Sequence, residues 1–277
     1  MTPARKPDDW DIGTGVRGYV WRSAAPRAAL LLQHGYGEYA ERFVDHYHRL
    51  IPRLTDVGID VFAIDMRGHG RSSGPRAVTD VNQAVSDHQA ARRAIDTGGK
   101  PLFLFGHSLG GLVTAVSVAR DQTGTAGVIL SAPALLIEAP QALRWIAQIL
   151  GAVAPGFGIA APQPASRLSR IPEEVIAFES DALIYRGKMP ARLGASSIRV
   201  AAEGWRCYER WEVPVLVFHG TDDSHTAPRG SQAFVDRIRA DDKTIRLLPD
   251  GRHELLNDLS REVVLTDLMS WIERRLV

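Results

Sequence analysis

The sequence predicts an α/β protein with a mostly parallel central sheet, flanked by helices and interrupted by an inserted helical cap. First, apolar runs of strand length recur, most followed by a glycine-containing turn and a helical pattern, at residues 28–33, 59–65, 102–107, 126–131 and 213–219. Such runs lack polar alternation, which is typical of strands buried on both faces. Second, the alternation stops over residues 133–210 and then resumes. We therefore expect a core of residues 1–132 and 211–277, with 133–210 as the cap.

The composition is that of an ordinary globular protein. The chain has 277 residues, 45% hydrophobic and 23% charged, and this length suits one α/β unit with an insertion. The net charge of +1 does not indicate a nucleic-acid partner. Cys207 is the one cysteine, so no internal disulfide can form, as is usual in a reducing compartment.

The beginning of the chain gives no indication of export. Residues 1–11 lack an apolar stretch of signal-peptide length, and no window approaches the roughly 20 apolar residues that span a bilayer. We expect a cytoplasmic protein, and peripheral contact with a membrane surface remains an option.

The buried strand at residues 28–33 ends in the sequence His34-Gly35-Tyr36-Gly37-Glu38. Two glycines directly after a strand let the backbone approach a neighbouring site, which makes the N–H of Tyr36 a candidate oxyanion donor. We expect His34 to hold this loop through hydrogen bonds. A helical pattern follows over residues 43–54; within it, His46 and His48 are spaced i, i+2, so they face different sides and do not form a metal pair.

The strand at 102–107 leads into Gly106-His107-Ser108-Leu109-Gly110-Gly111 and then a helical pattern to residue 120. A Gly-X-Ser-X-Gly turn between a strand and a helix is a nucleophile elbow, which lifts the serine hydroxyl clear of the sheet edge. We therefore predict Ser108 as a catalytic nucleophile. The unpaired N–H groups of the new helix, beginning near Leu109, face a developing oxyanion.

The cap sequence is unusually apolar. Apolar residues recur at helical spacing over 143–153, and the segment is broken up by prolines. One interpretation is a helix packed inward; the other is a lid that covers an acyl pocket and docks on a lipid surface.

The acid and the base follow the serine in the order typical of elbow enzymes. The strand at 213–219 ends in a turn containing Asp222 and Asp223, and His253 follows the last strand, at 243–248. His253 is predicted to take the serine proton, with an acid fixing its tautomer. Spacing alone does not choose between Asp222 and Asp223. Asp65 also ends a strand and is a rival acid, but it precedes the serine.

Six segments together resemble a known family: residues 34–43, 65–72, 106–111, 168–175, 219–223 and 253–254. They resemble the monoacylglycerol lipases, in the branch of the α/β-hydrolase superfamily shared with lysophospholipases. The resemblance runs from about residue 18 to residue 275, cap included. It implies the α/β-hydrolase fold.

The resemblance also assigns residues. It selects Asp223 as the acid, implies that the N–H groups of Tyr36 and Leu109 are the oxyanion donors, and places Glu38 and Arg42 at the polar end of the pocket, where glycerol sits. By spacing alone, Glu38 and Arg42 would form an exposed i, i+4 ion pair.

The chain departs from the family pattern near that polar end. The family often has a tyrosine in the cap where this chain has Phe178. Some members carry a second histidine three residues after the base, where this chain has Leu256. Ser224 and His225 follow the acid, where the family usually has arginine or another non-serine residue and then an apolar one.

The leading hypothesis from the sequence is therefore cleavage of a monoacylglycerol to glycerol and fatty acid through an acyl-enzyme, without a metal or cofactor. The substrate would be a small lipid ester. A lysophospholipase or a broad-specificity carboxylesterase would use the same site. An acyltransferase or a non-catalytic lipid-binding protein is the alternative of another class. Acyl-chain length and oligomeric state are not determined by the sequence.

Overall fold

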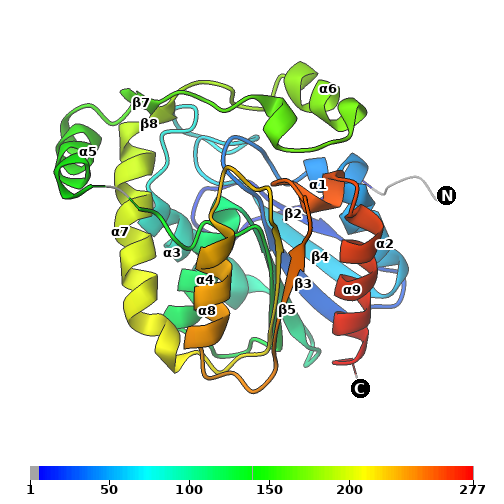
Figure 1. Ribbon diagram of the computed structural model, residues 1–277. Helices are drawn as coiled ribbons and strands as arrows, with labels where there is room; N and C mark the ends of the chain where they lie inside the picture. The colour runs from blue at the N-terminus through cyan, green and yellow to red at the C-terminus, as the bar shows by residue number, and fades with distance from the viewer. Residues whose placement is uncertain (1–5, 139, 277) are drawn as a thin grey trace.

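The computed structural model describes residues 6–138 and 140–276, so residues 1–5 of the N-terminal stretch considered above lie outside the described residues. Eight strands form one sheet in the order β1-β2-β4-β3-β5-β6-β9-β10 (Figure 1). Their bounds are β1 (Asp8–Trp10), β2 (Gly18–Trp21), β3 (Ala28–Gln33), β4 (Ile59–Ile64), β5 (Leu102–His107), β6 (Gly127–Ser131), β9 (Val215–Gly220) and β10 (Lys243–Leu248). β2 pairs antiparallel with both β1 and β4, and the remaining pairs are parallel, which confirms the predicted fold class.

Helices cover both faces of this sheet (Figure 1). One face carries α3 (Val81–Ala94), α4 (Leu109–Arg120), α7 (Ala191–Cys207) and α8 (Pro228–Arg237), and the other carries α1 (Arg42–Asp45), α2 (Leu50–Asp56) and α9 (Arg261–Glu273). Successive residues of a strand point to opposite faces, so Leu31 joins the first core while Leu30 and Leu32 join the second. This explains why the strands are apolar at every position.

The prediction of one helix over residues 43–54 is wrong, because the segment is interrupted in its middle. The segment divides into α1, a 3₁₀ turn and α2, because Tyr47, His48 and Arg49 have positive φ angles of 52°, 54° and 57°. Tertiary contacts hold Tyr47, since its N–H donates to the side chain of Asn257 and its hydroxyl donates to Glu38. A break of this kind depends on residues more than 200 positions away.

The segment between β6 and β9 adds no strand to the main sheet. It contains α5 (Gln141–Val153), the short pair β7 (Gly158–Ala160) and β8 (Met189–Pro190), α6 (Pro172–Ser180) and α7. Its first part lies across the top of the molecule in Figure 1. Hydrogen bonds from Tyr185 to Gly37, Gln163 to Ser224 and Glu254 to Leu168 join it to the loops after β3, β9 and β10. The segment therefore lies over the carboxyl ends of the strands.

The orientation of α5 decides between the two interpretations of its apolar pattern. Its small residues face α7, where a Cβ on Gly151 would lie 3.0 Å from the Cβ of Ala195. Leu150 is partly buried, but five of its large apolar side chains are more than half exposed: Leu143, Trp145, Ile146, Ile149 and Val153. The helix is thus not packed inward by its large residues. Within the described ranges, none of the helices combines the length and apolarity needed to cross a bilayer.

Candidate active site

Ser108 lies at the turn between β5 and α4 in a strained conformation. Its φ is 54° and its ψ is −119°, a region that non-glycine residues rarely adopt. The turn is packed tightly against the end of β3: a Cβ on Gly110 would lie 2.3 Å from the carbonyl oxygens of both Gln33 and His34. The glycine two residues after the serine is therefore required sterically, which explains the motif.

The structure brings Ser108, His253 and Asp223 into one line. His253 Nε2 lies 2.8 Å from Ser108 Oγ, and His253 Nδ1 lies 2.8 Å from Asp223 Oδ2. A ring nitrogen that faces a carboxylate carries the proton, so Nε2 is left to accept the proton of the serine hydroxyl. The side chain of the neighbouring Asp222 points elsewhere, with Oδ2 3.9 Å from Arg252 Nε.

Asp65, the rival acid, serves the loop after β4 instead. Its carboxylate accepts hydrogen bonds from the hydroxyl of Tyr19 at 2.9 Å, from the N–H of Ala40 at 2.9 Å and from the N–H of Arg71 at 2.8 Å. It is completely buried, and its partners explain its position at the strand end without any contact with Ser108.

Asp223 is held by donors from its own loop and from β9. Its Oδ1 accepts the backbone N–H of His225 at 2.7 Å and that of Thr226 at 3.1 Å. On the other side, His219 Nε2 lies 3.2 Å from Oδ2. Burial alone would raise the pKa of Asp223, but His253 and His219 hold that pKa well below its usual range. The carboxylate is therefore ionised across the working pH range.

His253 is buried and responds to the charges around it. Burial alone would lower the pKa of His253, but the Asp223 carboxylate, with smaller contributions from Glu254 and Glu38, raises that pKa above its usual value. An imidazole beside an ionised carboxylate is stabilised in its protonated form. This is the form that a general base reaches after taking a proton.

The loop after β3 lies directly against the serine. A Cβ on Gly35 would be only 3.1 Å from the Cβ of Ser108. His34 pins this loop as predicted: its Nδ1 lies 2.7 Å from the carbonyl oxygen of Gly35, and its Nε2 accepts the N–H of Met66 at 2.9 Å. In the described part of the chain, the N–H groups of Tyr36 and Leu109 form no hydrogen bond and are free to bind a ligand oxygen.

Glu38 and Arg42 are buried, not an exposed pair. Glu38 accepts the N–H of Gly35 at 2.7 Å with Oε1, and with Oε2 it accepts Arg42 Nη1 at 2.9 Å and the hydroxyl of Tyr47 at 2.8 Å. Arg42 Nη1 also lies 3.3 Å from Glu254 Oε1. Arg42 Nη2 is sealed from solvent and has no partner in the described residues. This network joins the Tyr36 loop to the residue that follows His253.

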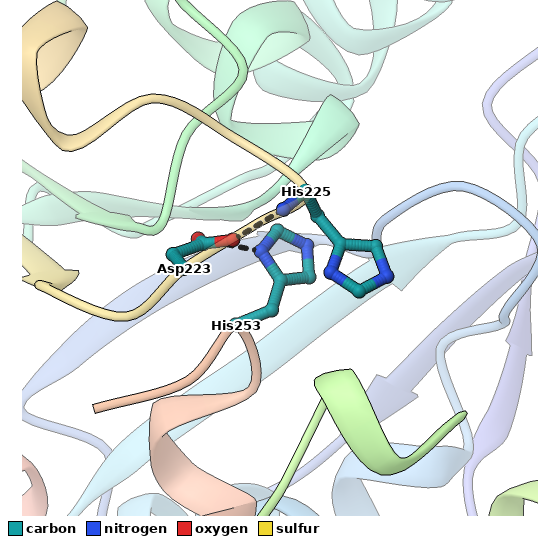
Figure 2. A group of neighbouring side chains, drawn as sticks. All are labelled: Asp223, His225 and His253. Carbon is teal, nitrogen blue, oxygen red and sulfur yellow. Dashed lines mark hydrogen bonds and ion pairs between the residues drawn. The ribbon is translucent and has the colours of Figure 1, made fainter. Parts of the chain in front are cut away.

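Figure 2 shows a third residue, His225, beside Asp223 and His253. These three offer metal-ligand atoms within 4.8 Å of one another. However, the rings of His225 and His253 are stacked at 4.8 Å with an angle of 21° between their planes. The nitrogen lone pairs lie in the ring planes, and two separate, nearly parallel planes do not meet close to the rings, so the two histidines are poorly arranged to bind one ion.

Sequence reasoning missed three residues of the site: His219, Tyr47 and Glu254. Glu254 acts on Arg42 through a contact between distant segments, whereas Tyr47 lies nine positions after Glu38 and His219 lies four positions before Asp223. Its position in His219-Gly-Thr-Asp-Asp223 at a strand end was the available signal.

Comparisons with known proteins identify the family of the chain. A family model described as serine aminopeptidase, S33, matches residues 24–260. The monoacylglycerol lipase of Mycolicibacterium smegmatis is 33% identical, over 91% of each chain, and the human monoglyceride lipase is 29% identical, over 92% of this chain and 86% of that protein. The crystal structure of a monoacylglycerol lipase from Paleococcus ferrophilus has a TM-score of 0.84 at 29% identity and covers 94% of this chain and 99% of its own.

A relative with another substrate is also similar. The caffeoylshikimate esterase of Arabidopsis thaliana is 27% identical, over 90% of this chain and 78% of that protein. From the family model, the relatives and the fold, this chain belongs to the serine aminopeptidase S33 family of α/β hydrolases, in the branch of the monoacylglycerol lipases.

Proposed function

We propose that this chain is a serine hydrolase that cleaves monoacylglycerols into glycerol and a free fatty acid. The observation that carries the proposal is the line from Asp223 through His253 to Ser108, with 2.8 Å on each side of the imidazole. A serine on a strained elbow, a correctly oriented base and an ionised acid are what acyl transfer from an ester requires. The lipase relatives supply the substrate class.

In the first half of the reaction, Ser108 Oγ attacks the ester carbonyl while His253 Nε2 takes its proton. Asp223 stabilises the imidazolium that forms. The oxyanion is bound by the N–H groups of Tyr36 and Leu109, and the loss of one such donor typically costs about 3 kcal/mol of barrier. When the tetrahedral intermediate collapses, His253 returns the proton to the leaving alcohol, and the acyl group stays on Ser108.

In the second half, water takes the place of the alcohol. His253 removes a proton from that water, which attacks the acyl-enzyme through the same oxyanion site. The fatty acid leaves as Ser108 regains its proton. Each half-reaction thus uses the same base in both directions.

At the polar end, we assign different tasks to Glu38 and Arg42. Both oxygens of Glu38 are occupied by protein donors, including the N–H of Gly35 directly before Tyr36. Glu38 therefore orients Arg42 and the oxyanion loop. Arg42 Nη2 has no partner in the described residues but is sealed from solvent, so we propose that it binds a glycerol hydroxyl once the side chains over it move aside.

The cap is proposed to bring the enzyme to lipid. The five exposed apolar side chains of α5 form one face, which would enter the interface of a bilayer. The boundaries of the cap at residues 133 and 210 are a prediction from the sequence. Because the buried residues Leu193, Val200 and Ala201 of α7 belong to the main core, we propose that only residues 134–190 could move over the site.

The hydrolase proposal is tested by the rates for a medium-chain monoacylglycerol, the matching diacylglycerol, a lysophospholipid and a p-nitrophenyl ester. We expect a preference for the monoacylglycerol and loss of all four activities in Ser108→Ala. Wild-type rates in the Ser108→Ala variant would refute the nucleophile. Equal rates on all four esters would mean a broad carboxylesterase, and a lysophospholipid preference a lysophospholipase.

The same assay with an added alcohol tests for an acyltransferase, which would form a new ester faster than free acid. Binding of the monoacylglycerol without any turnover would mean a lipid-binding protein. The membrane proposal is tested by flotation with phosphatidylcholine vesicles. The double variant Trp145→Ser/Ile149→Ser should lose most binding. The matched control Leu259→Ser/Val263→Ser removes side chains of similar exposure, 65% and 56%, outside the cap, and an equal loss there would contradict the proposal.

A further inference from the structure

His225 is a histidine of the site that the reaction described above does not use. Its backbone is fixed relative to the acid, because its N–H donates to Asp223 Oδ1 at 2.7 Å. The preceding residue, Ser224, is tied to the cap: its carbonyl oxygen accepts Gln163 Nε2 at 2.9 Å, and its hydroxyl donates to Gln163 Oε1 at 2.9 Å. The loop therefore holds His225 where the cap meets the acid.

The ring of His225 stacks beside that of His253, with 4.8 Å between centroids and 21° between planes; Figure 2 shows the two rings displaced sideways from one another. In the described part of the chain, neither ring nitrogen has a hydrogen-bond partner, and Nδ1 is also sealed from solvent. Nε2 is not among the sealed atoms, so it is the ring nitrogen that is available to a ligand. Packing against His253 alone would not need a polar ring.

The position of His225 specifies which part of an ester it meets. The leaving oxygen must lie next to His253 Nε2, because that nitrogen returns the proton to it. The alcohol therefore occupies the space beside the His253 ring, while the acyl chain extends away from it. A ring stacked on His253 borders the alcohol.

The charge state of His225 suits a neutral polar ligand. Burial, together with the neighbouring His253, lowers the pKa of His225 to about 4. At neutral pH the ring is uncharged and offers one donor and one acceptor. The accessible Nε2 can therefore donate to or accept from a hydroxyl group, depending on the tautomer. The neutral ring also adds no positive charge beside the imidazolium of His253.

We propose that His225 is a specificity-determining residue that hydrogen-bonds a free hydroxyl group of the leaving alcohol through Nε2 and so favours glycerol esters over esters of simple alcohols. This rests on the proposed function. It gives the polar end of the site a histidine from the acid loop, in a chain that has Leu256 and Phe178 where the family pattern has polar residues.

The test compares 1-decanoylglycerol with propyl decanoate, which has the same acid and a three-carbon alcohol without the two free hydroxyls. Two variants separate the ring from its nitrogens: His225→Phe keeps the stack and loses both nitrogens, and His225→Gln keeps polar atoms and loses the ring. We expect the ratio of kcat/KM for the glyceryl ester to that for the propyl ester to fall about three- to tenfold in His225→Phe, as for one hydrogen bond. His225→Gln should retain part of the ratio that His225→Phe loses.

A second measurement does not depend on the amount of active enzyme. The acyl-enzyme, formed from p-nitrophenyl decanoate, is offered glycerol and 1-propanol at equal concentration, and the two product esters are counted. The glycerol hydroxyl attacks, its proton passes to His253, and Ser108 is released. Because an enzyme does not change overall equilibria, the ratio of glyceryl to propyl ester must fall by the same factor in His225→Phe.

An unchanged ratio in His225→Phe, by either measurement, would overturn the proposal. A fall of this ratio in His225→Gln but not in His225→Phe would also overturn the proposal, because loss of the ring stack would then be the cause. If wild-type enzyme hydrolyses both esters while these ratios do not move, only the role of His225 fails. If wild type hydrolyses neither, the proposed function fails first.

Discussion

The buried ion network beneath the site gives a quantitative prediction. The Arg42 side chain is only 1% exposed, and its Nη1 lies 2.9 Å from Glu38 Oε2 and 3.3 Å from Glu254 Oε1. Arg42→Met preserves most of the side-chain volume but leaves two buried carboxylates without their cation. Breaking a buried ion pair by removing one partner costs about 3–5 kcal/mol of folding free energy.

The pKa of Glu254 agrees with the direction of this effect. Burial alone would raise that pKa, but Arg42 above all, with His107 and Asn257, lowers it below its usual value. The stability that this interaction provides is present above the unfolded-state pKa and is lost as the pH falls through the folded-state pKa. For a protein of this length, a loss of 3–5 kcal/mol lowers Tm by roughly 6–15 °C.

The pH dependence follows from the same charges. In Arg42→Met, both carboxylates have pKa values above those of free carboxyl groups, because burial is no longer offset by the cation. Glu38, whose pKa burial already raises in the wild type, takes up a proton first. The deficit in stability is therefore largest near pH 7 and becomes smaller near pH 5.

The assay is thermal unfolding followed by circular dichroism at both pH values. Arg71→Met is the matched control, because Arg71 Nε lies 2.9 Å from Glu41 Oε2, but these side chains are 57% and 28% exposed. An exposed pair contributes about 1 kcal/mol or less. Equal drops in Tm for the two variants, or a deficit in Arg42→Met that is as large near pH 5 as near pH 7, would refute the reasoning.

Two further predictions concern the elbow and the acid. Asp223→Asn should lower kcat by about 10⁴-fold. It should also move the acidic limb of the kcat/KM profile to lower pH, because Asp223 is what raises the pKa of His253; a limb that stays in place would contradict that assignment. Gly110→Ala should destabilise the fold by about 1–3 kcal/mol in urea unfolding, because the new Cβ would overlap two carbonyl oxygens of the β3 end. Gly156→Ala, whose Cβ would have its nearest neighbour 3.8 Å away, is the control; equal losses would show that the overlap is not the cause.

The fold class and the position of the nucleophile are properties of local sequence. Strand-length apolar runs without alternation require strands covered on both faces, and the structure has helices on both faces of the sheet. The elbow can be recognised locally, because its glycines lie within three positions of Ser108 along the chain, although the contact that requires Gly110 is with the end of β3. The chain order of serine, acid and histidine then singles out His253 from nine histidines.

The choice between Asp222 and Asp223 was beyond local sequence. The two carboxylates are neighbours in one turn, and they differ only in the direction of their side chains. That direction is set by the N–H groups of His225 and Thr226 and by the nearby ring of His219, which together hold Asp223 toward His253. Only the folded loop provides these donors.

Burial of polar pairs and orientation of an apolar helix also required the tertiary structure. The spacing of Glu38 and Arg42 describes an exposed ion pair until Glu254, more than 200 residues later, lies against Arg42. The periodicity of α5 defines an apolar face without saying which side is covered. The small residues on its other side, packed on α7, decide that the large ones face outward. The sequence by itself therefore determined which elements form and where the serine lies, because those depend on neighbours along the chain. Tertiary structure alone decided which side chains meet, because these contacts join segments that are far apart along the chain.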